Sequence, residues 1–145
     1  MFKNLLDILK NLRNSIGAVI KQTFKETEHT AIDMNVSQMY DFGVDRNNEM
    51  IGEYSDYTKS VKSAKGQKFD FVTLRDTGDF HDNMGFQQIT EEYAEIDSSD
   101  IKTSEIKEEF GDEIMGLTEE NKQEYSLHFE AEFIEQLKKR INEQN

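Results

Sequence analysis

Cysteine and proline are both absent from this chain of 145 residues. Without cysteine there is no disulfide and no thiolate metal site, which fits a reducing compartment and leaves stability to packing alone. Without proline, only the eight glycines are expected to interrupt helices. Long apolar runs are missing as well, because charged residues break up the N-terminal segment at regular intervals from Lys3 to Arg13. We therefore expect no membrane span and no signal-peptide core.

Basic residues are few, at 17 against 30 acidic ones, and the formal net charge is −13. The two signs are separated along the chain: basic residues gather in 1–25 and 59–68, whereas 91–132 holds 15 acidic and three basic side chains. This distribution argues against general DNA binding, because phosphate contacts need a basic face, so we do not expect nucleic acid as a partner. It allows docking to a basic partner or between neighbouring copies. A solvated acidic surface that keeps the protein soluble explains it equally well.

Hydrophobic periodicity predicts helices at both ends of the chain. Apolar residues recur at three- and four-residue steps from Phe2 to Phe24, and a second helical stretch is expected over 31–40, before Gly43. Thr118 is the predicted N-cap of the last helix. The apolar stripe of that helix is expected at Leu127, Ala131, Ile134, Leu137 and Ile141, widened by Phe129 and Phe133.

The middle of the chain predicts short extended pieces and turns. The expected elements are an extended pair over 44–51, a helix over 55–64 capped by Ser55, a strand over 69–74, a hairpin of strands 86–90 and 93–96, and a helix over 101–110. This order predicts an α+β fold in which a small antiparallel sheet packs against N- and C-terminal amphipathic helices. We expect one domain over 1–145, made of a helical N-terminal arm (1–40), a sheet-forming core (41–99) and C-terminal helices (100–145).

Asp76-Thr77-Gly78 is the tripeptide of aspartic proteases, in which two copies bring two carboxylates together. Its surroundings do not fit that chemistry, because Arg75 precedes it, Asp79 follows it and no glycine-rich flap is present. A strand-to-helix turn is the favoured interpretation, with Thr77 or Asp76 as a helix cap and Gly78 supplying the backbone conformation.

The other titratable residues form no complete catalytic or metal-binding pattern. A metal cluster of Asp76, Asp79, His81 and Asp82 is disfavoured, because a single helical turn points these side chains in different directions. His29, His81 and His128 lie far apart without a nucleophile, and His128 is expected to pack. Two tyrosines and four lysines hint at nucleic-acid contact, at Tyr54, Tyr57, Lys59, Lys62, Lys65 and Lys68. We expect no enzyme activity, no metal and no cofactor.

Four segments occur in a recognisable order: Ile51-Gly-Glu-Tyr-Ser-Asp-Tyr-Thr58, Lys62 with Gly66, Val72-Thr-Leu-Arg-Asp-Thr-Gly-Asp-Phe80, and Phe110-Gly-Asp-Glu-Ile-Met-Gly-Leu-Thr118. In this order they resemble small virion proteins of tailed bacteriophages, of the tail-completion, head–tail connector (neck) or minor tail type. The resemblance covers residues 40–120. It departs from the pattern at Asp79, where many relatives have a basic residue after the glycine.

The resemblance implies a structural subunit of the virion, assembled in the host cytoplasm, that contacts copies of itself in a ring and portal, neck or tail proteins. No catalytic residue carries over; the structural turn would consist of Asp76, Thr77, Gly78 and Phe80. Opposite charges would meet between copies, and the candidate contact residues are Lys3, Lys10, Arg13, Glu108, Glu109, Asp112 and Glu113. The net charge favours an alternative from another class, a small acidic inhibitor or DNA mimic.

Overall fold

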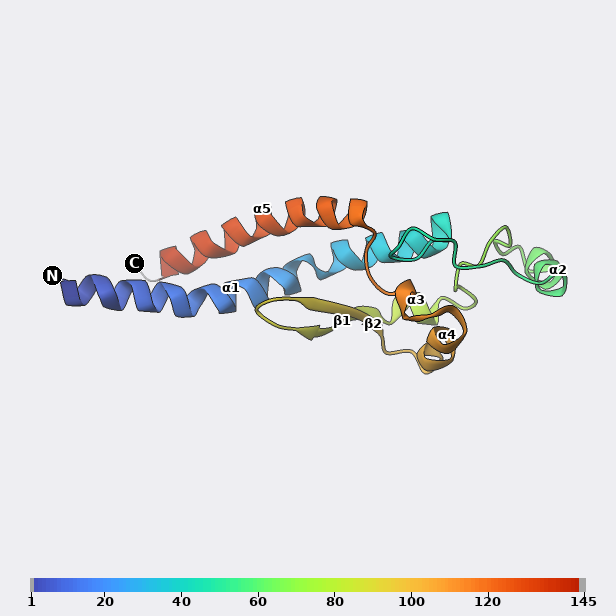
Figure 1. Cartoon of the computed structure of the whole chain (residues 1–145), viewed down its shortest axis with the longest axis horizontal. Helices are drawn as coiled ribbons and strands as arrows, with labels where there is room; N and C mark the ends of the chain where they lie inside the picture. Colours follow the sequence, from blue (N-terminus) through green and yellow to red (C-terminus); the bar gives the residue numbers. More distant parts are fainter. Residues whose placement is uncertain (1, 144–145) are drawn as a thin grey trace.

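The computed structural model describes residues 2–143, with side chains from Asn4 onward. Two long helices, α1 (Phe2–Ser37) and α5 (Glu119–Glu143), lie side by side in opposite directions, so both chain ends are at the same end of the molecule (Figure 1). A two-stranded antiparallel sheet lies along α1, and α2 (Asp56–Ala64) lies at the far end. The chain is α+β, as predicted.

The predicted hairpin is confirmed as β1 (Met84–Ile89) and β2 (Ala94–Ser98), paired antiparallel with Met84 opposite Ser98 and Ile89 opposite Ala94. Its tight link begins at Thr90, whose hydroxyl accepts from the backbone N–H groups of the two residues that close the turn, at 3.1 and 3.0 Å. The shorter elements around it are α3 (Asp79–Asp82), α4 (Thr103–Phe110) and the 3₁₀ turn η2 (Asp112–Ile114).

The prediction of two separate N-terminal helical stretches is wrong, because α1 runs unbroken and continues into the π-turn η1 (Gln38–Phe42). The polar residues between the expected stretches stay helical, and the threonines just before and within them, Thr23 and Thr27, are buried. The hydroxyls of Thr23 and Thr27 donate to the carbonyls four residues earlier, each at 2.7 Å, so neither is left unsatisfied. Gly43 ends the helix as predicted, with φ of 65° and its N–H bonded to the Gln38 carbonyl.

The prediction of a strand over 69–74 is also wrong. The backbone bond from Val72 N–H to the Gly52 carbonyl, 2.9 Å, is a single cross-link between loops and not a ladder. Leu74 has φ of 57°, which a regular strand cannot contain. The β-branched and aromatic residues here serve packing, and Val72 and Thr73 are almost fully buried. The expected extended pair at 44–51 is confirmed as one antiparallel bridge between Val44 and Met50.

The core lies where η1, α3 and β1 meet the segment 114–118 before α5, which we call the connector. Its buried members are Met39, Phe80, Met84, Ile114 and Met115. Three of these five residues are methionines, whose unbranched side chains fill irregular gaps between short elements. No cysteine or proline constrains this region, so its shape depends on packing and on hydrogen bonds.

The predicted stripe of α5 is only partly the buried one. Leu127, Ile134 and Ile141 are exposed, whereas Phe129 and Phe133 face inward and are half-buried. Phe129 lies 4.8 Å from the Phe24 ring centroid on α1. The aromatic rings determine which face of α5 turns toward α1, because they bury more apolar area than the aliphatic residues of the predicted stripe. His128, which was expected to pack, is exposed.

Ser55 caps α2 as predicted: its hydroxyl accepts from the Thr58 N–H at 3.2 Å. We expect Ser55→Ala to destabilise α2 by about 1 kcal/mol, because one of the first N–H groups loses its partner. Amide hydrogen exchange in α2 should then become about fivefold faster. Ser63→Ala is the matched control on the same helix, since its exposed side chain makes no cap. Equal exchange rates in the two variants would contradict the cap.

Candidate functional site

The Asp76-Thr77-Gly78 turn leads into α3 and is held by short-range hydrogen bonds. Gly78 has φ of 97°, in the left-handed region that favours glycine. The Thr77 hydroxyl donates to the Asp79 carboxylate at 2.8 Å and accepts from the Asp79 N–H at 3.3 Å. Phe80 follows directly and is buried in the core, whereas Asp76 is exposed. The turn therefore sets where Phe80 joins the core.

Two lysines of the basic run over 59–68 are used inside the fold. Lys62 is 8% exposed and donates to the Arg75 carbonyl at 3.0 Å, just before the turn. Lys68 donates to the Tyr40 carbonyl at 3.1 Å at the end of η1. Half of the four lysines that hinted at nucleic-acid contact thus position loops.

His81 lies in α3 and is 5% exposed, and neither of its ring nitrogens has a hydrogen-bond partner that meets normal geometry among the described residues. Burial, and to a lesser extent the nearby Arg75 guanidinium, lowers the pKa of His81 from 6.5 to about 4. The Thr73 backbone and the Asp82 carboxylate act in the opposite direction. His81 is therefore neutral at pH 7 in the folded protein.

The acidic residues around His81 do not gather about it. Asp76, Asp79 and Asp82 are all exposed, while the imidazole is buried. Across residues 2–143, the structure contains no group of three or more His, Asp or Glu side chains arranged to hold a metal ion. Within the same residues, no helix is long and apolar enough to cross a membrane.

The charged candidates for contact between copies lie far apart within one chain. Lys10 and Arg13 are exposed near the free end of α1, and the Lys3 side chain lies outside the described residues. The acidic candidates lie on α4 and η2, toward the other half of the molecule (Figure 1). Of these, Glu108, Glu109 and Asp112 are exposed and Glu113 is half-buried. One copy therefore does not bring the two sets together.

Residues 4–16 of α1, which we call the overhang, form a large exposed apolar surface. The first turns of α1 extend past the C-terminal end of α5 (Figure 1), and the last turns of α5 flank the rest, where Arg140 lines a hollow with Ile8 and Ser15. The apolar side chains over 4–16 are 37–61% exposed. They are Leu5, Leu6, Ile8, Leu9, Leu12 and Ile16. The sequence pattern indicated this stripe, but it could not show where the partner helix stops.

The apolar face of the overhang belongs to a line of residues along α1, which we call the seam, and this line is buried farther along the helix. Leu5, Leu9, Leu12 and Ile16 follow one another at steps of four and three residues, and the next steps reach Val19 and Thr23. Val19 and Thr23 are 4% and 0% exposed where α5 covers α1. The same face of α1 is therefore exposed over 5–16 and buried at Val19 and Thr23.

A groove of about 650 Å³ opens between α1, the hairpin, the connector before α5 and the start of α5. Its apolar lining includes Phe24, Phe86, Ile96, Met115 and Leu117. This volume is typical of sites that take up side chains or small ligands. At one wall the Tyr125 hydroxyl lies 2.8 Å from the Thr27 hydroxyl. Burial raises the pKa of Tyr125 above its usual value, against the effect of this hydrogen bond.

Two buried amides, which we call the amide clamp, hold the connector that forms the floor of the groove. Asn35 is 0% exposed; its amide donates to the Ile114 carbonyl at 3.0 Å and its oxygen accepts from the Gly116 N–H at 2.8 Å. Gln38 donates to the Gly116 carbonyl at 3.0 Å and accepts from the Thr118 N–H at 3.0 Å.

Sequence reasoning missed the amide clamp entirely. Asn35 and Gln38 lie within a helical segment in which polar residues normally face solvent. The available signal was their spacing: Asn35 follows Ala31, and Met39 follows Asn35, at four-residue steps on the apolar face. A polar residue at such a position is buried only with hydrogen-bond partners.

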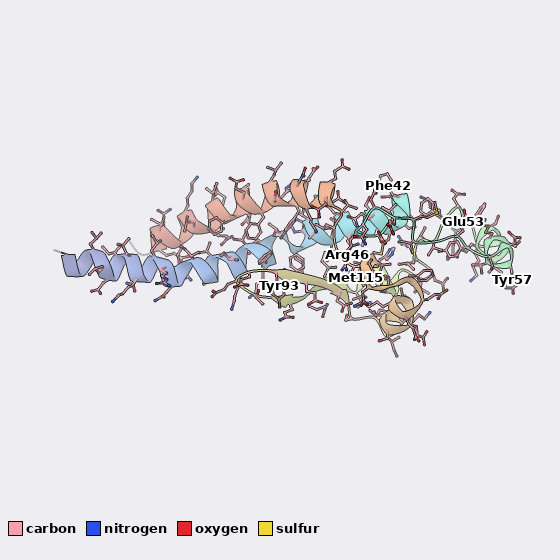
Figure 2. All side chains as sticks on the ribbon, viewed as in Figure 1. Phe42, Arg46, Glu53, Tyr57, Tyr93 and Met115 are labelled. Atoms are coloured by element: carbon pink, nitrogen blue, oxygen red, sulfur yellow. The ribbon has the colours of Figure 1, made fainter. Side chains whose placement is uncertain are left out.

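Arg46 lies next to Met115 in the middle of the molecule (Figure 2), and its guanidinium donates a hydrogen bond to the Met115 carbonyl at 3.4 Å.

Comparison with protein-family models, with curated proteins and with solved structures finds no match to this chain.

Proposed function

We propose that this chain is a structural subunit of a tailed-bacteriophage particle, a head–tail connector, neck or tail-completion protein that acts by protein–protein assembly. The single observation that carries the assembly role is the open seam on the overhang. The resemblance of residues 40–120 to small virion proteins supports the place of that assembly. In this proposal the chain catalyses no reaction and needs no cofactor.

The overhang supports assembly on energetic grounds. Its six apolar side chains are about half exposed. Burying that remaining surface would contribute roughly 5 kcal/mol before the cost of association is subtracted. Contiguous apolar surface of this kind on a soluble protein marks an interaction site. An isolated helix end gains little from apolar side chains that face water, so a contact made after folding accounts for them.

The acidic inhibitor or DNA mimic remains a second candidate, favoured by the exposed acids on α4 and η2. Glu108 and Glu109 follow one another on α4, and Asp112 stands just beyond its end. The two candidates differ in what they require. An inhibitor needs a basic partner and has no use for the overhang, whereas an assembling subunit needs the overhang itself.

We expect the purified protein to grow from its monomer mass of 16.9 kDa into a closed oligomer as its concentration rises. Leu9→Glu with Leu12→Glu should leave it monomeric, because two charges would be buried in the contact. Light scattering over a range of concentrations and salt measures the mass directly. In the phage that encodes the chain, the protein should be a component of purified particles.

The control is Tyr57→Glu, which places the same charge on an apolar side chain that is 80% exposed at the opposite end of the molecule (Figure 2). This variant should assemble as the wild type does. A wild-type protein that stays monomeric under all conditions would contradict the proposal. Salt-sensitive binding of such a monomer to a basic nucleic-acid enzyme would favour the inhibitor instead.

A further inference from the structure

We propose that the overhang of one copy docks into the groove of the next copy, so that the contact between subunits is head-to-tail. This inference rests on the proposed assembly role and names the two surfaces that make it. An amphipathic helix that lays its apolar face into an apolar groove is a common mode of recognition, with anchors at steps of three and four residues. Leu5, Leu9 and Leu12 supply such anchors.

The groove cannot be filled by the overhang of its own chain. Phe24 lines the groove on the same helix, and α1 is continuous from the overhang to that residue. Leu5 lies about 28 Å from Phe24 along the axis at 1.5 Å per residue. An unbroken helix cannot fold back on itself over that distance, so an overhang in the groove must come from another copy.

Charge complementarity favours a second copy as the occupant. On the groove rim, the Lys107 ammonium lies 2.8 Å from the Asp97 carboxylate, and Lys122 lies 3.0 Å from Glu119. These pairs neutralise two of the three cations that line the groove, and the third, Arg46, forms no ion pair with a described residue. The lining carboxylates of Glu95 and Asp112 form no ion pair with a described residue.

The overhang contains Asp7, Lys10 and Arg13, so it is net positive, and its two cations lie on one side of the helix. Arg13 lies four residues after the anchor Leu9, and Lys10 lies four residues after Leu6, so each cation stands one turn from an apolar side chain of the overhang. Neither cation forms an ion pair with a described residue of its own chain. The exposed carboxylates of Glu108 and Glu109 on α4 extend the negative charge beyond the rim of the groove.

A head-to-tail contact has a consequence that a symmetric pair of overhangs lacks. Each copy keeps one free overhang and one free groove, so addition continues until a ring closes. A symmetric pair would also bring two basic helix ends together, because Lys138, Lys139 and Arg140 lie in the last turns of α5 and Arg140 lines a hollow with Ile8 and Ser15. The repulsion between them opposes that arrangement.

Disulfide cross-linking tests the contact, since the chain has no cysteine of its own. Leu9→Cys and Ala94→Cys, carried on separately tagged chains and mixed, should cross-link to each other, because Ala94 lines the groove. Leu9→Cys mixed with Ser63→Cys is the control and should not cross-link, because Ser63 lies on the distant α2. Arg13→Glu should weaken association about tenfold, and adding Asp112→Lys to it should restore most of the loss.

The outcomes separate this inference from the proposed function. An oligomer that forms but gives no link between positions 9 and 94 would overturn the docking while leaving the assembly role intact. A link between two Leu9→Cys chains would replace it with a symmetric pair. A monomer that binds anionic phospholipid vesicles through the overhang would overturn both.

Discussion

Asn35→Ala should remove about 2–6 kcal/mol from the free energy of unfolding. The substitution removes two hydrogen bonds and leaves the Ile114 carbonyl and the Gly116 N–H without partners in the interior. Each unsatisfied buried group costs about 1–3 kcal/mol, and small domains are stable by only about 5–15 kcal/mol. Urea denaturation followed by circular dichroism measures the loss as a lower midpoint at an unchanged slope.

Asn14→Ala is the matched control, because Asn14 is exposed on the same helix. That change should alter stability by less than about 0.5 kcal/mol, as surface substitutions usually do. If the two variants unfold at the same urea concentration, the amide clamp does not stabilise the connector as the geometry indicates.

The amide clamp also links stability to the proposed contact between copies. Met115 and Leu117 line the groove, and they belong to the connector that Asn35 and Gln38 hold. A connector released from these amides would no longer present a fixed floor. We therefore infer that the buried amides of Asn35 and Gln38 determine the shape of this part of the groove.

Local patterns predicted the elements whose cause is local. Ser55 and Thr118 cap helices because an N-cap depends on residues within one turn, and the hairpin around Thr90 depends on its own turn. Gly43 ended its helix for the same reason. These features need no information from distant parts of the chain, which is why the sequence alone indicated them.

The features that the sequence could not indicate depend on long-range partners. Thr27 is buried because Tyr125, 98 residues away, meets its hydroxyl. Whether Leu127 or Phe129 faces α1 depends on the rings that α1 presents, and that choice left Leu127 exposed. The open seam of the overhang depends on where α5 ends relative to α1, a property of the folded pair.

Stability should fall steeply as the pH drops from 6.5 toward 4, and His81 should cause a distinct part of that loss. Its pKa is about 4 in the folded protein and 6.5 when exposed, so the unfolded chain binds the extra proton throughout this window. Stability therefore rises with pH here and is fully present above 6.5, and His81 alone should contribute about 3 kcal/mol between the two limits.

The many carboxylates of this chain also titrate at low pH, so the contribution of His81 is a difference between variants. Urea unfolding at a series of pH values should give a shallower slope for His81→Gln than for wild type between pH 6.5 and 4, whatever its stability at pH 7. His128→Gln is the control, because His128 is exposed and should leave the slope unchanged. Equal slopes for the wild type and His81→Gln would mean that the buried imidazole accepts its proton without opening the fold. In that case the neutral His81 would not be part of what holds α3 against the core.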